Sequence, residues 1–598
     1  MRHRRLPETQ TSRETVDVFL GYNHNLRIGD GEFYDMKNLS SREFPILTPR
    51  GQRGIYAVPN DSFTGLTVAK EKPCYVDGSD IVIDGVRVSL GLDGRQKQLV
   101  KMGAYVLIFP DKKYINTIDF TDCGEMENAT VTKGDAVGGI SFQMCKHDGE
   151  GYTVDFQQDT APENPPDGAV WLDTSLYPNA LRQYAAASGM WVQIATTYIK
   201  ISARGIGIGF KKGDGVKISG LAGVELEDYE TQGGSLEDPA ISAIDGAFVL
   251  QDCGDDFLII VGLLPTAHKL SNTVTVERKL PIMDYVIESG NRLWGCRYGT
   301  SDDGEIVNEI YASKLGDFKN WNCFEGISTD SYIVSVGTDG AFTGAVTHLG
   351  SPLFFKEDCM HKLYGTNPPF QMQTTACRGV QKGSHGSLAI VNEVLYYKSR
   401  NGVCAYDGSL PVEISEAFGD LFYNSAVGGS HANKYYISMQ DDNARYHLFV
   451  YDTKRRVWHK EDNTRVTCFA SCGGEMYFID HDTGNITTVF GSGKLQSGQV
   501  EWMAQTGVIG TDRLGKKYLS RLNIQLVLEI GSRVNFYVQY DSVGDFEYIC
   551  TLAGVSLRSF SVPIRPKRCD HLRLRIEGKG EAKIFYIAKT FEQGSDIG

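Results

Sequence analysis

The residues best able to bind a charged partner lie in one basic segment near the C-terminus. The stretch PIRPKRCDHLRLRI, residues 563–576, carries the basic side chains Arg565, Lys567, Arg568, Arg573 and Arg575. Guanidinium and ammonium groups spaced along a chain can contact nucleic-acid phosphates or an acidic protein surface. No aromatic side chain interleaves with these charges, so an ordinary solvated strand face is the simpler interpretation. We keep the residues as candidate contacts for a partner or a phosphate.

Other motifs that could carry chemistry lack the required spacing. GIGIG, residues 205–209, has no Lys-Ser/Thr of a phosphate loop, and no helical pattern follows it. The acidic turns at 77–80 and 301–305 do not match a calcium loop. GSHGS at 383–387 does not match a nucleophile elbow, and His481 lies in a turn-like segment between two aspartates. We predict no catalytic, cofactor-binding or metal-ligating residue, and therefore that the chain is not an enzyme.

Composition narrows the class of protein. The 598 residues include 66 Gly and 30 Tyr but only 19 Pro, which favours an all-β chain rich in turns. A formal net charge of −14 argues against a protein that simply coats DNA. The 13 cysteines are scattered without zinc spacing, so we expect reduced thiols that pack as small hydrophobic groups. There is no long apolar run, so no transmembrane helix is predicted.

A repeated unit organises much of the chain and predicts its fold. The equivalent apolar positions of this unit are Leu293, Leu353, Leu395, Tyr436 and Met476. They are spaced by 60, 42, 41 and 40 residues, and the longer first spacing implies an insertion. Two weaker units, residues 72–90 and 103–120, precede them. Units of this length with short strands are typical of β-propeller blades, so we predict about seven blades. A β-sandwich with repeating hairpins is the alternative.

An acidic region interrupts the repeat. Residues 121–280 hold 11 Lys and Arg against 23 Asp and Glu, so most of the net negative charge lies there. The segment 162–194 is strand-like, and we expect Trp171 and Trp191 to be core aromatics of an inserted β domain.

The C-terminal region has the clearest period-two alternation, which predicts antiparallel strands with one solvated face. The side chains expected on buried faces are Leu522, Ile524, Leu526, Leu528, Ile530, Val534, Phe536, Val538, Tyr540, Leu572, Leu574 and Ile576. From residue 512 onward there are 14 Lys and Arg against 10 Asp and Glu, so this region is basic.

The predicted fold class is therefore all-β: a propeller with an inserted small β domain and a C-terminal antiparallel β-sandwich. The predicted order is an N-terminal extended segment (1–54), first propeller blades (55–120), the acidic inserted domain (121–280), the remaining blades (281–496) and the sandwich (497–598).

The N-terminal segment 19–54 resembles the opening of a family of tailed-bacteriophage tail proteins. This is the nozzle or tail-hub group, often labelled packaged-DNA stabilisation proteins. The positions that match its opening are Asp30, Gly31, Glu32, Asp35, Met36, Asn38, Leu39, Ser40, Pro45, Leu47, Pro49, Arg50 and Gly54. Residues 383–408 are similar to a blade of that group, and the C-terminal region is similar to its sandwich. The acidic insertion departs from the simplest members.

The resemblance implies a structural virion protein located in the phage tail and made in the host bacterial cytoplasm. It implies a homo-oligomeric ring, expected to be a hexamer, below the portal and adaptor. Other tail proteins and passing double-stranded DNA would be its partners, and the ring would continue the DNA channel and retain the genome until ejection. An acidic lumen would repel phosphate and let DNA slide.

Two other classes of function compete with the conduit. A baseplate or host-receptor-binding tail protein would recognise cell-surface glycan through the propeller face or the insertion, with Trp171 and Trp191 as platforms. A propeller glycosidase would use paired carboxylates in the central channel, but nothing in the sequence selects such a pair.

Overall fold

The structure is a computed structural model, and it describes residues 11–593 apart from 134–138, 152, 177–178, 223–238, 271, 302–303, 494, 497, 512–514 and 555. The described elements are strands, except for one helical turn, α1 (Pro239–Ser242), and two 3-10 turns, η1 (His385–Ser387) and η2 (Glu416–Phe418). None of the described helices is long and apolar enough to cross a membrane. The protein is all-β, with a β-propeller, an inserted β region and a C-terminal β-sandwich, which confirms the predicted fold class.

The chain divides into two compact units. Unit 1 comprises residues 1–99, 340–362 and 373–598, and unit 2 comprises residues 100–339 and 363–372. The described part of unit 1 holds the sandwich and most of the blades, whereas unit 2 holds two blades and the insertion.

Six propeller blades are meanders of four consecutive antiparallel strands. In unit 1 these are β7 (Phe63–Ala69), β8 (Lys72–Asp77), β9 (Asp80–Ile83) and β10 (Val86–Ser89); β36 (Ala389–Val391), β37 (Val394–Lys398), β38 (Val403–Tyr406) and β39 (Val412–Glu413); and β40 (Tyr423–His431), β41 (Lys434–Asp441), β42 (Tyr446–Asp452) and β43 (Val457–Lys460). In unit 2 they are β11 (Gln98–Met102), β12 (Tyr105–Phe109), β13 (Lys113–Asn116) and β14 (Cys123–Glu125); and β28 (Tyr285–Ser289), β29 (Arg292–Thr300), β30 (Ile306–Ala312) and β31 (Tyr332–Ser335). The sixth meander is β32 (Gly344–His348), β33 (Ser351–Phe355), β34 (Cys359–Tyr364) and β35 (Gln371–Ala376).

The seventh blade is completed by a strand from the N-terminal part of the chain. Its strands β44 (Val466–Cys472), β45 (Glu475–Asp480) and β46 (Ile486–Thr488) are joined by β6 (Gly54–Ala57), which also pairs with β47 (Leu495–Gln496). Gly54 lies opposite Thr488, and a Cβ at Gly54 would come within 2.7 Å of the backbone nitrogen of Gly493. Residues 55–57, grouped by sequence with the first blades, therefore belong to the last sheet.

The repeated apolar positions lie on the second strand of their blades. Leu293, Leu353, Leu395 and Met476 are completely buried, and Tyr436 is nearly so. Buried side chains of neighbouring blades share clusters; one joins Leu353, Leu395 and Tyr397. The repeat therefore marks the packing contacts between blades.

The described part of the insertion in unit 2 contains three sheets. Two of them share a buried core: β15 (Asn128–Lys133), β27 (Thr273–Arg278), β22 (Gly215–Ser219) and β23 (Gly246–Val249); and β24 (Asp252–Gly254), β25 (Phe257–Val261), β21 (Tyr198–Ser202), β16 (Ile140–Cys145) and β26 (His268–Leu270). The third contains β17 (Phe156–Gln158), β18 (Val170–Asp173), β19 (Ala180–Ala185) and β20 (Met190–Gln193). The segment 205–209 forms turns, as expected.

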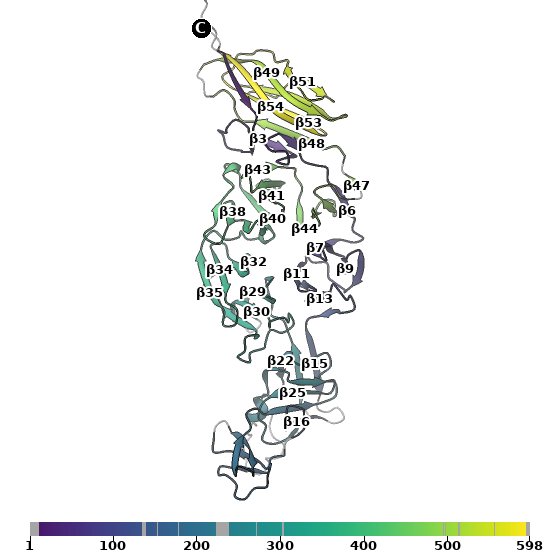
Figure 1. Cartoon of the computed structure of the whole chain (residues 1–598), viewed down its shortest axis with the longest axis vertical. Coiled ribbons are helices and arrows are strands. Elements are labelled where there is room, and N and C mark those ends of the chain that lie inside the picture. Colours follow the sequence, from purple (N-terminus) through teal and green to yellow (C-terminus); the bar gives the residue numbers. More distant parts are fainter. Residues whose placement is uncertain are drawn as a thin grey trace, which may run out of the picture. The chain divides into compact units, whose positions relative to one another are not determined.

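The sandwich of unit 1 is built from both ends of the chain. One sheet has the order β1 (Thr11–Val16), β54 (Ala582–Gln593), β49 (Lys517–Leu528) and β52 (Arg558–Val562). The other has the order β2 (Gly21–Tyr22), β3 (Glu32–Lys37), β48 (Glu501–Thr506), β53 (Leu572–Lys579), β50 (Arg533–Tyr540) and β51 (Glu547–Ala553). A short pair, β4 (Leu39–Ser40) and β5 (Thr48–Pro49), follows β3. Figure 1 shows β3, in the purple of the N-terminus, beside the green β48.

The predicted inward faces of the sandwich are confirmed with one exception. Leu522, Ile524, Leu526 and Leu528 are buried, as are the apolar positions predicted on β50 and β53. Ile530 is 99% exposed, because β49 ends at Leu528 and Ile530 falls in the following turn. The prediction that Ile530 faces the core is therefore wrong.

Candidate binding surfaces

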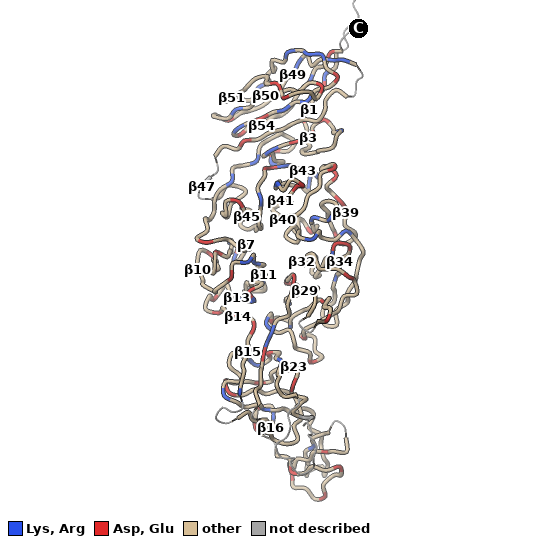
Figure 2. The backbone as a smooth tube through the Cα atoms, turned by 180° about the vertical axis from the view of Figure 1, so that it is seen from behind, with Lys and Arg blue, Asp and Glu red and all other residues tan. Residues whose placement is uncertain are grey.

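The basic segment spans a loop and a strand of the sandwich. Arg565, Lys567 and Arg568 are exposed between β52 and β53, and the Lys567 ammonium lies 3.0 Å from a carboxylate oxygen of Glu547. Figure 2 shows basic and acidic positions interspersed along the strands of the sandwich. The loop is therefore the part of the segment most accessible to a partner.

The other two candidates, Arg573 and Arg575, lie on the outer face of β53 and are half-buried. The Arg573 guanidinium lies 5.2 Å from the ring centre of Tyr34, and that of Arg575 lies 4.1 Å from the ring centre of Phe546. Arg575 also donates hydrogen bonds to Gln505 Oε1 at 2.8 and 3.1 Å. The aromatic partners come from distant segments, which explains why none interleaves in the sequence. These contacts make both arginines part of the outer sheet surface.

The residues that carry the family resemblance join the N-terminal segment to a blade and to the sandwich within unit 1. Asp35 Oδ1 accepts a hydrogen bond from Lys460 at 3.0 Å, and Asn38 Nδ2 donates to the carbonyl of Glu501 at 2.8 Å. Arg50 Nε donates to Asn38 Oδ1 at 2.8 Å. The matched positions therefore have a structural task in this chain.

A buried ion cluster reinforces this junction. Arg53 lies 2.7 Å from Glu461 and 2.9 Å from Asp462, and Arg50 lies 3.3 Å from Asp462. Burial alone would raise the pKa of Asp462, but Arg53 and Arg50 outweigh it and lower this pKa to about 2. Asp462 therefore stays ionised over the ordinary pH range.

The third sheet of the insertion presents aromatic side chains on one side. Cross-strand pairing places Phe156 beside Trp171 and Tyr184 beside Trp191. The ring centre of Trp191 lies 5.3 Å from those of Trp171 and Tyr184, and 6.4 Å from that of Phe156. We call these four residues the aromatic face.

The two tryptophans of the aromatic face differ in exposure. Trp171 is 5% exposed, and its Nε1 donates to the carbonyl of Gln158 at 2.9 Å, as expected of a core residue. Trp191 is only half-buried, so the prediction that it is a core aromatic is wrong. The physical reason is that β20 is the edge strand of its sheet, so no further strand covers it.

An ion pair borders the aromatic face. Arg182 lies over the Trp171 ring, 5.8 Å from its centre, and its Nε donates to Asp173 at 2.9 Å. Hydrogen bonds from Ser175 and the ion pair with Arg182 hold the pKa of Asp173 below its ordinary value despite burial. The face therefore combines partly exposed ring surface with fixed polar groups.

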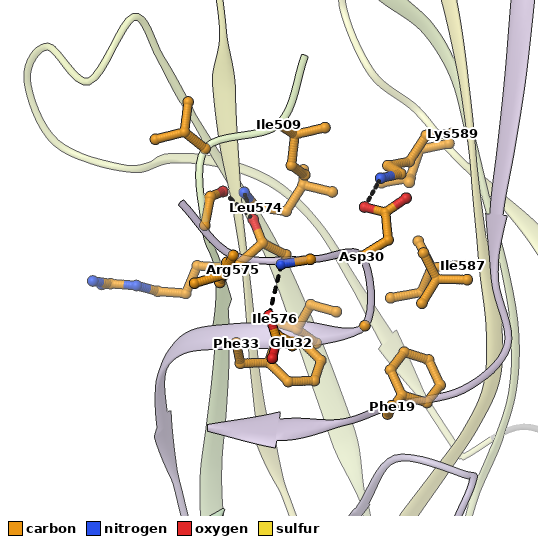
Figure 3. Close-up of a pocket in the computed structure, with 18 of the residues that line it drawn as sticks. Phe19, Asp30, Glu32, Phe33, Ile509, Leu574, Arg575, Ile576, Ile587 and Lys589 are labelled. Carbon is orange, nitrogen blue, oxygen red and sulfur yellow. Dashed lines mark hydrogen bonds and ion pairs between the residues drawn. The ribbon is translucent and has the colours of Figure 1, made fainter. Parts of the chain in front are cut away.

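A small apolar cavity lies in the sandwich, with a volume of about 50 Å³. We call it the socket; its labelled lining residues in Figure 3 are Phe19, Asp30, Glu32, Phe33, Ile509, Leu574, Arg575, Ile576, Ile587 and Lys589. The exposed members of the full lining are Gly29 and Asp30, so these mark its mouth.

Polar contacts fix the mouth of the socket. The buried Lys589 ammonium lies 2.8 Å from Asp30 Oδ1 and 3.4 Å from Glu14 Oε2. Gly31 has φ +89°, and a Cβ there would lie 2.2 Å from the carbonyl oxygen of Val18. Only glycine fits at position 31 without displacing the Val18 backbone. This explains why a glycine stands between Asp30 and Glu32.

The acidic turns and the GSHGS segment, which the sequence raised as candidates for metal binding and nucleophilic chemistry, make hydrogen bonds within the fold where they are described. Asp77 in the first acidic turn accepts backbone hydrogen bonds from Asn60 and Asp61 at 3.1–3.2 Å, and the second turn lies partly outside the described residues at 302–303. Ser384 accepts a hydrogen bond from the backbone N–H of Ala426. Over the described ranges, no group of three metal-ligating side chains occurs. All 13 cysteines are free thiols.

Comparison with known proteins identifies no family. No family model matches the sequence, and no curated protein matches it. Among solved structures, the chain is similar to an exo-β-1,3-galactanase from Phanerochaete chrysosporium at 8% identity, covering 50% of this chain and 94% of that one with a TM-score of 0.21. It is also similar to the phage phi92 endosialidase, at 9% identity, covering 76% of this chain and 69% of that one with a TM-score of 0.24. At these values neither activity nor substrate transfers to this chain.

These comparisons correct one prediction. The similar structures are a galactanase and an endosialidase, so the prediction that the chain is not an enzyme is contradicted. The prediction relied on local motifs, but two carboxylates suffice for glycoside hydrolysis. In a propeller they can come from different blades, and no sequence spacing would reveal such a pair. The absence of a motif therefore did not exclude an active site.

Proposed function

We propose that this chain is a tail-associated virion protein of a bacteriophage and that it recognises cell-surface glycan through its aromatic face. The observation that carries the proposal is the partly exposed Trp191, whose ring contacts the other three rings of the aromatic face. The family resemblance of the N-terminal segment supports the placement in a phage tail.

The chemistry of the aromatic face suits a saccharide. A sugar ring has apolar C–H faces, which pack against an aromatic ring, and a rim of hydroxyls, which need fixed polar partners. Trp191 and Tyr184 offer the ring surface, whereas Asp173 and Arg182 are held in place by their ion pair. A pre-formed site of this kind loses little side-chain freedom on binding.

Binding of the full chain to host envelope glycan tests the proposal. Trp191→Ala should weaken binding at least about tenfold, because it removes the central ring of the face. Met190→Ala is the matched control: Met190 is on the same strand and 61% exposed, and its side chain points to the opposite side of the sheet from Trp191. Equal affinity of Trp191→Ala and the unaltered chain would reject the aromatic face as the site.

A ring that continues the DNA channel below a portal and adaptor is the second candidate function. The observation that favours it is that the matched residues of the opening, such as Asp35, Asn38 and Arg50, form one connected junction. If this chain has the architecture of the nozzle group, the residues that match that group's opening should have a common structural role, such as forming this junction. The two candidates differ in where the copies lie in the particle and in whether DNA passes through them.

A further inference from the structure

Ile530 is an apolar side chain held outward by a rigid turn. It is 99% exposed and lies between β49 and β50. The backbone N–H of Ser532 donates to the carbonyl of Glu529 at 2.9 Å, and Gly531 has φ +86°, so the turn is hydrogen-bonded and uses glycine at its strained position. The side chain is therefore presented in a fixed direction.

The socket has the size and polarity to receive such a side chain. A water-sized group needs about 10–15 Å³ of such space, so about 50 Å³ holds three to five of these groups. The side chain of isoleucine has a comparable number of carbon atoms. Phe19, Leu574 and Ile587 line the interior, as Figure 3 shows, so the site favours an aliphatic group over a polar one.

The two features of one chain are too far apart to meet. Leu522 and Ile524 on β49 contribute to the socket wall, and Ile530 follows six residues after Ile524. At about 3.3 Å per residue, this separation along the strand is about 20 Å. Ile530 can therefore enter only the socket of another molecule.

Charges beside the two features are complementary. Glu529 and Arg533 flank Ile530 and are exposed, while Asp30, which is also exposed, and Lys589 line the socket at its mouth. Opposite charges around an apolar contact fix its register and exclude wrong partners. We propose that Ile530 of one copy inserts into the socket of a second copy of this chain.

The contact joins two different surfaces, so it is head-to-tail. Such contacts generate a closed ring if the rotation between copies closes, and an open filament if it does not. The proposal does not depend on glycan recognition, since the aromatic face belongs to the insertion.

The mass of the full chain in solution, measured by sedimentation velocity over a range of concentrations, tests the contact. We expect self-association of the unaltered chain, weakened at least about tenfold by Ile530→Ser. This change should leave the fold intact because the side chain makes no internal packing contact. Ile306→Ser is the matched control, since Ile306 is 82% exposed but lies in unit 2.

A photo-reactive amino acid at position 530 locates the contact. Cross-linking between copies should reach the segment around Asp30 or the strands that line the socket. The proposal is overturned if the unaltered chain stays monomeric, if Ile530→Ser assembles as well as the Ile306→Ser control, or if the cross-link reaches another surface.

Discussion

At the scale of single residues, the most consequential groups are the charges buried beneath the N-terminal segment. Arg53 contacts both Glu461 and Asp462, and Arg50 reaches Asp462 from the same segment. Removing one member of a buried ion pair leaves its partner desolvated and uncompensated. This cluster therefore links the stability of the junction to pH.

Asp462→Asn should lower the free energy of unfolding by about 2–4 kcal/mol at neutral pH, because Glu461 alone then compensates Arg53 and Arg50. The contribution of Asp462 has a defined pH window. Its pKa in the fold is about 2 against an ordinary 3.8, so its stabilisation is present above about pH 4 and is lost as the pH falls toward 2. Urea unfolding at several pH values measures both effects.

Asp482→Asn is the control for this prediction, because the side chain of Asp482 is 70% exposed. It should change the stability by less than about 0.5 kcal/mol. The role of the cluster would be contradicted if Asp462→Asn were as stable as the Asp482→Asn control at neutral pH. It would also be contradicted if the difference in stability between these two variants were the same at pH 2 as at pH 7.

At the scale of elements, sequence periodicity predicted the strands because one face of each is buried. Repeated apolar positions such as Leu353 and Leu395 identified the blades, and alternation identified β49, β50 and β53. The alternation wrongly predicted that Ile530 is buried, because the alternation of residue types continues beyond the end of β49. It also could not show that β1, β2 and β3 join the sandwich, since pairing across the length of the chain leaves no local signal.

The candidate site was less predictable than the fold. Trp171 and Trp191 stood out by residue type, but their exposure depends on which strand lies at the sheet edge. Likewise, the aromatic partners of Arg573 and Arg575, Tyr34 and Phe546, come from segments that the sequence does not place beside β53.

Ile524→Asp should unfold the sandwich or cost more than about 3 kcal/mol, because it places a charge among apolar side chains between the two sheets. Gln525→Asp, on the outer face of the same strand, should change stability by less than about 1 kcal/mol. Thermal unfolding of both variants makes the comparison. Similar melting of the two would mean that the face assignment of β49 is wrong.

At the scale of the whole molecule, one chain combines a propeller, an acidic insertion and a sandwich. The acidic insertion and the basic stretch from residue 512 onward give regions of the chain different electrostatic characters. The number of copies in an assembly, expected to be six from the family resemblance, stays a prediction.

Electron cryo-microscopy of the particle that we propose contains this chain is the most direct test of the central claim. The account predicts density for the chain on the tail, with the aromatic face turned outward if glycan recognition is its task. An axial ring with DNA in its bore would instead select the conduit. Particles that lack the chain altogether would contradict its assignment as a tail-associated virion protein.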